Sequence, residues 1–273
     1  MSIRLSGEQV AFFHREGYLA IPQIIPPEEI GQMRAIYDRL FQQQAGRSEG
    51  NQFDLAGTDE EDKRAKLPQI LNPPKYAPEI ESFQMKANGL AIARQLLGPE
   101  AVSHGDHAIL KPGPSDAVTP WHQDEAYWAP DLDYTSISIW TPLQDVNEEL
   151  GCMQFIPGSH KLEVLPHRHI NNDPRIHGLE VDGGPADARR AVACPLPAGG
   201  ATIHASRTLH YTAPNRTNQP RRAYIMTFGV PPRKRAAPRE FPWLLQQKTA
   251  RSERAAQAAA AGKDVGPQPG VTR

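Results

Sequence analysis

The residues best suited to chemistry lie in residues 120–128, where an imidazole and a carboxylate stand two positions apart at His122 and Asp124. On an extended strand, two such residues project from the same face. They need only a second imidazole to form a facial triad, which leaves three positions open on iron(II). His210 is the best candidate for this third ligand, because Arg221, a basic residue suited to a carboxylate, follows it. The sequence thus predicts a metal site made of these two histidines and the aspartate.

A second His-X-Asp pattern occurs at His104 and Asp106, so the pattern alone has little specificity. A glycine separates these two residues and indicates a bend in the strand. Aromatic residues flank His122 instead, and they can wall off a dry pocket. We therefore favour the later pattern, although a hydrogen-bonded core histidine is the ordinary interpretation of one such residue.

Arg221 stands at the start of a strand predicted over residues 222–228. A guanidinium is a rigid two-pronged donor, so an arginine near the metal can hold the far carboxylate of a diacid whose keto acid end chelates iron. Strand alternation points Arg222 to the opposite side. The alternative interpretation is a pair of surface arginines, because arginine is mostly exposed.

The charge balance points to a small-molecule partner. The chain of 273 residues has 30 basic and 31 acidic residues and a formal net charge of -1, which gives no general attraction to nucleic acid or anionic lipid. No apolar run approaches the roughly 18 residues of a membrane span, and the N-terminal residues show no apolar signal-peptide core. We therefore expect a cytoplasmic protein. Cys152 and Cys194 are expected to be buried thiols.

The first hundred residues carry mostly helical signals. A capping box at Ser6, proline and acidic residues at a helix start, and apolar residues at helical spacing are the main ones. They predict helices over residues 7–16, 26–41 and 80–97 and a strand over residues 18–22. The polar residues 46–65 are predicted to form a surface loop.

From Ala101 onwards, short strand-like runs alternate with proline and glycine. The predicted strands are residues 103–111, 119–127, 135–141, 153–156, 191–195, 201–206, 210–213 and 222–228. Eight such segments would fill a double-stranded β-helix, a jelly-roll barrel of two sheets. Residues 162–190 show little periodicity, and we interpret them as a long loop that acts as a mobile lid. A permanently ordered excursion is the alternative.

These elements predict a mainly β fold with flanking helices. We expect one domain over residues 1–245, with a helical part at residues 6–98 and the jelly-roll core at residues 101–230. Residues 246–273 are expected to form a polar, flexible tail.

Several motifs together resemble the phytanoyl-CoA dioxygenase family of iron(II)- and 2-oxoglutarate-dependent oxygenases. They occur in family order at residues 120–124, 140–145, 147–151 and 156–161, followed by His210 and Arg221. The resemblance covers roughly residues 9–230 of the chain.

The resemblance implies roles for individual residues. His122, Asp124 and His210 match the iron ligands, and Arg221 matches the arginine that grips the far carboxylate of 2-oxoglutarate. Further cosubstrate-contacting positions correspond to Thr212, Trp140, His107 and Lys66. Strand alternation agrees for Trp140, which shares a predicted polar face with Ser136 and Ser138.

The resemblance also implies a reaction. A dioxygenase of this family uses iron(II), 2-oxoglutarate and O2 to oxidise a C–H bond, commonly by hydroxylation, and releases succinate and CO2. Asp124 favours oxygen transfer, because related halogenases have a small residue at this position. The alternative is a non-oxidative metal-binding β-barrel, such as a zinc-dependent isomerase or a binding protein, since imidazole and carboxylate also suit zinc. Tyr127 and Trp128 predict an aromatic wall for a small substrate, whose identity the sequence does not give.

Overall fold

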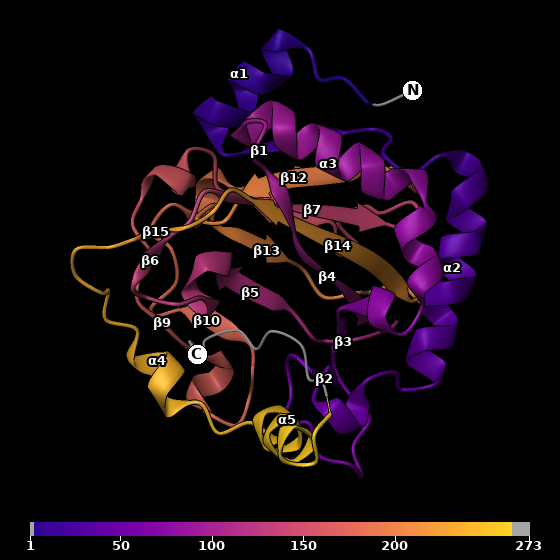
Figure 1. The fold of residues 1–273 in the computed structure, drawn as a ribbon, viewed down its shortest axis with the longest axis vertical. Coiled ribbons are helices and arrows are strands. Elements are labelled where there is room, and N and C mark those ends of the chain that lie inside the picture. Colours follow the sequence, from indigo (N-terminus) through magenta and orange to yellow (C-terminus); the bar gives the residue numbers. More distant parts are fainter. Residues whose placement is uncertain (1–2, 264–273) are drawn as a thin grey trace.

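Two antiparallel sheets form the centre of the molecule, as the computed structural model of the chain shows for residues 3–263 (Figure 1). The large sheet has the strand order β1 (Tyr18–Ile21), β12 (Ala201–Ala205), β7 (Ser136–Pro142), β14 (Arg221–Gly229), β4 (Val102–Lys111), β3 (Pro68–Leu71) and β2 (Gln52–Asp54). The small sheet has the order β11 (Val192–Cys194), β8 (Met153–Phe155), β13 (His210–Thr212) and β5 (Thr119–His122). This is the predicted double-stranded β-helix.

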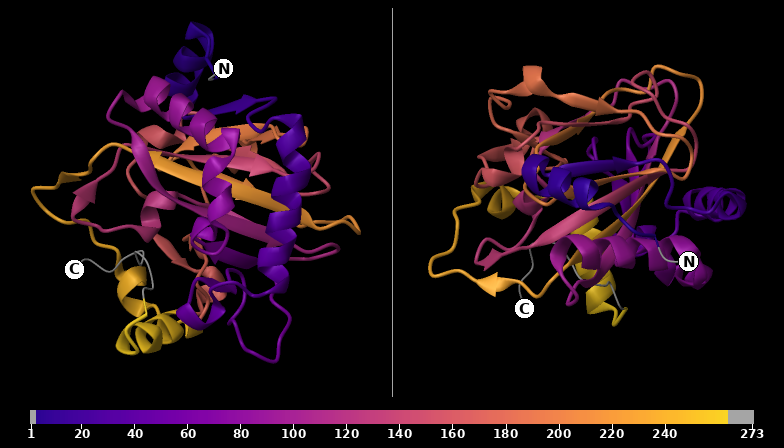
Figure 2. Two further views of the ribbon diagram at one scale, coloured as in Figure 1. Left: turned by 45° about the vertical axis from the view of Figure 1, so that its right-hand side comes forward. Right: turned by 90° about the horizontal axis from the view of Figure 1, so that it is seen from above.

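Helices cover the outer face of the large sheet, where Figure 2 shows α2 (Pro27–Gln42) and α3 (Gln84–Leu97) lying against it. Alternate residues of β14 face this layer and are buried in the main apolar core, among them Tyr224, Met226 and Phe228. From β7, Ile137 and Ile139 join the same core, as their predicted face requires. The opposite faces of these strands are therefore left to line the space between the sheets.

The N-terminal helices start and stop largely where the sequence predicts. In α1 (Gly7–Glu16), Ser6 and Gln9 form the expected capping box, and Gly17 ends the helix with a φ of 81° that suits glycine. The helix predicted from residue 80 begins only at Gln84, because Phe83 is extended and separates α3 from the short 3-10 helix η3 (Pro78–Ser82).

The predicted strands are present, but one of them is much shorter than expected. Residues 119–127 form β5 only up to His122, after which Asp124 opens the 3-10 helix η4 (Asp124–Tyr127). Glu125 N–H bonds the carbonyl of Ser206 and Ala126 N–H bonds that of Gln123, so this backbone turns inward and leaves the sheet. The prediction that both His122 and Asp124 lie on a strand was therefore wrong, although the two side chains still converge.

The surface loop predicted over residues 46–65 is confirmed only for residues 58–65, which form no helix or strand and are exposed at residues 60–64. Residues 46–57 differ from the prediction. They contain η1 (Arg47–Glu49) and β2, and residues 50–57 are buried. The Asp54 carboxylate accepts bonds from the backbone N–H groups of Ala56, Lys66 and Leu67, at 2.7 to 3.1 Å. Polar residues can be buried here because their hydrogen bonds are satisfied within the protein.

Residues 162–190 also have more structure than predicted. Strands β9 (His167–His169) and β10 (Leu179–Val181) pair as an antiparallel hairpin, joined through η6 (Ile170–Asn172) and followed by η7 (Ala188–Arg190). The prediction of a loop without regular structure was wrong, because His167 and His169 pack inward and satisfy their ring nitrogens with backbone groups. That this segment moves as a lid stays a prediction.

The C-terminal part contains β15 (Arg233–Lys234), which pairs with β6 (Leu132–Asp133), and the helices α4 (Pro242–Gln246) and α5 (Ala250–Ala260). The tail predicted to be flexible from residue 246 is helical at residues 250–260, since Thr249 caps α5 and Ala255 and Ala258 are buried. Residues 264–273 lie outside the part that the structure describes. Within residues 3–263, no helix has the length and apolarity of a membrane span.

Candidate metal and cosubstrate site

Two neighbouring strands and one turn bring the predicted metal ligands together. His122 at the end of β5 and His210 at the start of β13 are register partners, with ring centroids 4.1 Å apart. Asp124 follows from the first position of η4. One ligand atom from each residue lies within 4.8 Å of the other two, and no other such group of three occurs in residues 3–263.

Both histidines present the nitrogen that a metal needs. Nδ1 of His122 contacts the carbonyl oxygen of Pro120 at 2.8 Å, and Nδ1 of His210 contacts that of Thr208 at 2.9 Å. A carbonyl only accepts, so Nδ1 carries a hydrogen in each ring, and Nε2 of the neutral imidazole is the nitrogen left to bind a metal. Burial and the neighbouring His210 lower the pKa of His122 to about 3, which keeps this imidazole neutral.

The two oxygens of Asp124 have different surroundings. Oδ1 lies 3.4 Å from Nε2 of His210 and 3.8 Å from Nε2 of His122. Oδ2 accepts a hydrogen bond of 2.6 Å from the hydroxyl of Ser138 and lies 3.3 Å from Nε2 of His204. Burial raises the pKa of Asp124, but the His210 and His204 imidazoles outweigh it and hold the pKa well below its usual value. The carboxylate is thus ionised, with one oxygen directed to the candidate metal position.

This donor set fits iron(II). Two neutral imidazole nitrogens and one carboxylate oxygen on a single side of a cavity are the facial triad of non-haem iron oxygenases. Because the second carboxylate oxygen is already hydrogen-bonded, the geometry favours coordination through one oxygen only. The other side of the metal position stays open to the cavity.

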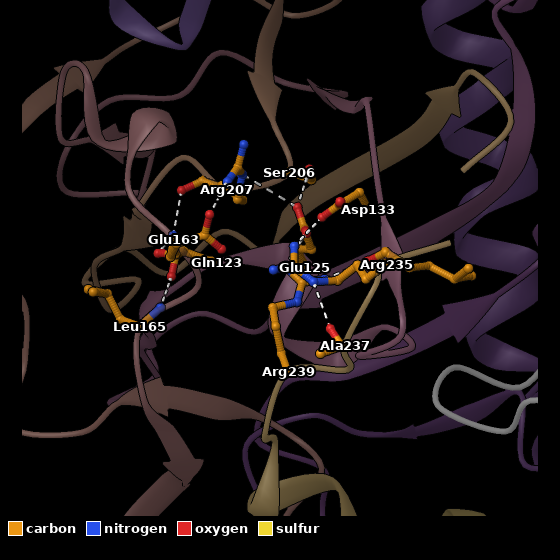
Figure 3. Close-up of polar contacts among 11 residues, drawn as sticks. Gln123, Glu125, Asp133, Glu163, Leu165, Ser206, Arg207, Arg235, Ala237 and Arg239 are labelled. Carbon is orange, nitrogen blue, oxygen red and sulfur yellow. Dashed lines mark hydrogen bonds and ion pairs between the residues drawn. The ribbon is translucent and has the colours of Figure 1, made fainter. Parts of the chain in front are cut away.

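The residue after Asp124 is anchored through a buried ion pair (Figure 3). Glu125 accepts a 2.6 Å bond from Nη1 of Arg239 and a 3.1 Å bond from the hydroxyl of Ser206. Its own N–H bonds the Ser206 carbonyl. Arg239 comes from the segment before α4, so the C-terminal part of the chain helps to fix the turn that carries Asp124.

The residue before Asp124 is anchored on the other side. The side-chain amide of Gln123 donates to the carbonyls of Arg207 and Glu163, at 2.8 and 3.3 Å, and its oxygen accepts from the N–H of Leu165 at 2.8 Å. Figure 3 shows these contacts beside those of Glu125. These contacts fix the residues on both sides of Asp124 and so orient this candidate ligand.

A cavity of about 500 Å³ lies between the two sheets and contains the three candidate ligands. Of the predicted cosubstrate-contacting residues, those that line this cavity are Arg221, Thr212, Trp140 and His107. Tyr127 and Trp128 line it as well, which agrees with the predicted aromatic wall. The structure therefore collects most of the predicted site in one place.

Arg221 and Arg222 point to opposite faces of β14, as predicted. Arg221 is 1% exposed, and its guanidinium carbon lies 5.3 Å from the ring centroid of Trp140. Its Nη1 donates to the carbonyl of Gly151 at 3.0 Å, but its buried Nε has no hydrogen-bond partner. Arg222 instead forms a two-pronged pair with Asp38 of α2, at 2.6 and 3.0 Å.

Two sequence candidates do not join the site. Lys66 is exposed and does not line the cavity; it lies just before β3, the second strand from one edge of the large sheet. Asp106 of the first His-X-Asp pattern is paired with Lys86 and accepts a 2.5 Å bond from Tyr224, on the helix side of β4. His104 is exposed. Both residues border the cavity, but neither belongs to the group of candidate metal ligands. Asp106 thus has a structural role.

Sequence reasoning missed His204 and undervalued Ser138. The two are register partners on β12 and β7, and both contact Oδ2 of Asp124. His204 is 2% exposed, and its Nδ1 has no hydrogen-bond partner. The alternation of Thr202, His204 and Ser206 with apolar neighbours in residues 201–206 could have placed His204 on the polar face.

The histidines of residues 162–190 are structural in part. His167 accepts a bond from the N–H of Gln123 at 3.2 Å, and His169 contacts the carbonyls of Ile176 and Trp243. His177 lines the cavity, where it stacks on Tyr127 at 5.7 Å. All three are buried, so they are not the solvated residues that a polar loop would contain.

Comparisons with known proteins agree with this geometry. A profile of the family "Phytanoyl-CoA dioxygenase (PhyH)" matches residues 13–223. A probable alpha-ketoglutarate-dependent hypophosphite dioxygenase of Stutzerimonas stutzeri is 25% identical over 82% of this chain and 78% of its own length. An ectoine dioxygenase of Streptomyces coelicolor is 28% identical over 58% of this chain, and the match spans only 52% of that relative.

Solved structures give the same result. EvdO2 from Micromonospora carbonacea var. aurantiaca, in complex with 2-oxoglutarate, is 38% identical with a TM-score of 0.76, over 89% of this chain and 98% of that one. EctD from S. alaskensis, with bound Fe, has a TM-score of 0.66 at 20% identity, over 83% of this chain and 77% of that one, and so supports the fold.

The fold and the site together define a non-haem iron(II)- and 2-oxoglutarate-dependent dioxygenase. The chain belongs to the phytanoyl-CoA dioxygenase family. The named relatives are dioxygenases, which favours oxidation over the alternative of a non-oxidative zinc protein.

Proposed function

We propose that the protein oxidises a C–H bond of a small molecule, most simply by hydroxylation, at an iron(II) held by His122, Asp124 and His210. The observation that carries this proposal is the convergence of the three ligand atoms, within 4.8 Å of one another, on a cavity of about 500 Å³. Iron(II) held there would activate O2, which is the oxidant, and 2-oxoglutarate would supply two electrons as it is converted to succinate and CO2.

The cosubstrate is proposed to lie between the metal position and Arg221. The buried guanidinium of Arg221 faces the cavity from β14 and has an unsatisfied Nε, so it suits the far carboxylate of 2-oxoglutarate. Thr212 adds a hydroxyl donor from β13, and Trp140 lies beside the guanidinium on β7. His107 borders the same space from β4, and burial lowers its pKa to about 4, which leaves it a neutral hydrogen-bonding group.

The substrate is proposed to occupy the other end of the cavity, where aromatic side chains predominate. Tyr127, Trp128 and Tyr134 line this part, and the rings of Trp128 and Tyr134 meet edge to face at 4.8 Å. Such walls exclude water around the reacting carbon. The protein thus orients the two reactants, and its ionisable groups hold their charge states rather than transfer protons.

A two-stage experiment tests the proposed function. Anaerobic iron(II)-loaded protein should develop visible charge-transfer absorption when 2-oxoglutarate is added, and in air it should then form succinate when a true substrate is present in a metabolite pool. Protein loaded with zinc is the control and should show neither signal. Failure of 2-oxoglutarate to bind to the iron-loaded protein would refute the proposal, whatever the substrate.

A further inference from the structure

Two buried cationic side chains lie beside each other at the cavity, which Arg221 lines. Lys111 of β4 and Arg221 of β14 are direct register partners, so they project from the same face of the large sheet. Lys111 is 0% exposed and Arg221 is 1% exposed. Like charges directly opposite each other on adjacent strands destabilise a sheet, and burial increases the cost.

The contacts of Lys111 provide acceptors for its hydrogen-bond donors but do not neutralise its charge. Its ammonium donates to the hydroxyl of Thr212 at 2.8 Å, to the carbonyl of Ala213 at 2.6 Å and to the carbonyl of Thr212 at 3.3 Å. These three acceptors match the three hydrogens of an ammonium group. None of them carries a negative charge.

Neither Lys111 nor Arg221 has an acidic partner in residues 3–263. Burial, and then the charge of Arg221, lowers the pKa of Lys111 well below its usual value, as expected for an uncompensated site. Buried charges are otherwise paired in proteins, and this chain follows the rule on the other face of the same strands, where Lys86 pairs with Asp106 and Arg222 with Asp38. The unpaired cations therefore indicate a place for an anionic group from outside the chain.

We propose that Lys111 is a positioning residue of the cosubstrate site. It holds Thr212 and adds a second positive charge, so that affinity depends on a second carboxylate in the ligand. This inference rests on the proposed function and extends it, because it makes the site selective for 2-oxo acids with two carboxylates over those with one.

The hydroxyl group of Thr212 transmits the effect of Lys111. Since the ammonium donates to the Thr212 oxygen, the single hydroxyl hydrogen of Thr212 must point elsewhere, and it is directed to the hydroxyl of Thr119 at 3.0 Å. Both threonines line the cavity. A carboxylate beside Arg221 can take this hydrogen in place of the Thr119 oxygen, and the adjacent ammonium polarises the hydroxyl that donates it.

The test compares two ligands on one variant. The wild-type protein and Lys111→Met, loaded with Mn(II) or anaerobic iron(II), are titrated with 2-oxoglutarate and with 2-oxopentanoate, which has the same chain length but no far carboxylate. We expect Lys111→Met to weaken 2-oxoglutarate binding by about 10- to 100-fold, from the usual energies of hydrogen bonds that involve charged groups. Binding of 2-oxopentanoate should change by less than about twofold.

Lys86→Met is the matched control, because Lys86 is a largely buried lysine paired with Asp106 of the same strand, on its helix side. It should leave the affinities for both ligands unchanged. Thr212→Val should reproduce the ligand discrimination of Lys111→Met, and it carries the test if the lysine variant does not fold. Equal losses for the two ligands, or no loss for either, would overturn the role of Lys111.

These outcomes are distinct from failure of the proposed function. If the wild-type metal-loaded protein bound no 2-oxoglutarate, the cosubstrate assignment itself would fail. If it bound 2-oxoglutarate well and Lys111→Met did so equally well, the cosubstrate assignment would stand and only the inference about Lys111 would be wrong.

Discussion

The two faces of β14 each carry an arginine, but the surroundings of the two side chains differ. Arg222 points to the helices and forms a two-pronged ion pair with Asp38, at 2.6 and 3.0 Å. Arg221, its neighbour in sequence, points into the cavity and has no acidic partner in residues 3–263. The protein neutralises its own charge on one face of the strand and leaves the charge uncompensated on the other.

The two His-X-Asp patterns differ in the same manner. Asp106 lies on the helix side, where Lys86 and Tyr224 satisfy one of its oxygens. Asp124 lies on the cavity side, where one oxygen faces two imidazoles and no cation of the chain. Residue types therefore do not distinguish structural from functional sites in this fold. The difference is whether another residue of the protein neutralises the charged side chain.

The largest expected effect is the loss of a metal ligand on the cavity side. His122→Ala, Asp124→Ala and His210→Ala should each abolish 2-oxoglutarate-dependent turnover, since each removes one of three ligands and with it the facial geometry. The fold should persist, because the apolar core and not the metal holds the sheets together. Succinate formation and circular dichroism measure the two properties.

His104→Ala serves as the control for these three variants and should be mild, because His104 is exposed and, although it borders the cavity, is not one of the candidate ligands. Near-normal turnover in Asp124→Ala, or full inactivation in His104→Ala, would reverse the assignment of the two patterns.

The next effect separates the two arginines. Arg221→Ala should cost roughly 2 to 4 kcal/mol of cosubstrate binding, which is about 30- to 1,000-fold in 2-oxoglutarate affinity, by analogy with other desolvated charge pairs. Iron binding should survive. Arg222→Ala should affect this affinity at least tenfold less, and it should instead reduce stability by up to about 1 kcal/mol, because its ion pair is partly exposed. Equal effects on affinity would contradict the difference between the two faces.

The alternation of strands explains why so much of this was predictable from sequence. A period of two separates Ile137 and Ile139, which enter the core, from Trp140, which lines the cavity. It also separates Arg221 from Arg222. Alternation does not predict which distant residues come together. The family motifs predicted that His122 and His210 do so.

Other features depend on contacts that sequence does not reveal. Lys111 stands at the end of a strand, before a proline, and lysine is mostly exposed. The sequence therefore does not indicate that Lys111 is fully buried beside Arg221. Strand β5 ends early where Glu125 turns inward, and Glu125 is paired with Arg239, a residue more than a hundred positions later in the chain. Helix α5 is polar enough to suggest a tail, yet Arg251 reaches the buried Gly50 carbonyl at 2.9 Å.

A smaller effect is expected at the oxygen of Asp124 that faces away from the metal. Ser138→Ala removes the 2.6 Å hydrogen bond to Oδ2 and should weaken iron(II) affinity by roughly tenfold, the lower end for partners of metal ligands. Ser136→Ala is a matched control, because Ser136 is buried on the same face of β7 and its hydroxyl has no partner in the described residues. Competition with a metal-binding dye measures both variants. An equal loss in the control would indicate a general effect on β7.

The smallest effect should come from Lys66, which the family resemblance places among the cosubstrate contacts. Its side chain is exposed and outside the cavity, and only its backbone is fixed, through a 2.7 Å bond to Asp54. We therefore expect Lys66→Ala to change 2-oxoglutarate affinity by less than about twofold, since exposed charges in water contribute little. Titration beside Arg221→Ala measures the difference directly. If the two variants lost similar affinity, the chain before β3 would have to close over the cavity when the cosubstrate binds, and an exposed lysine would then be as functional as a buried arginine.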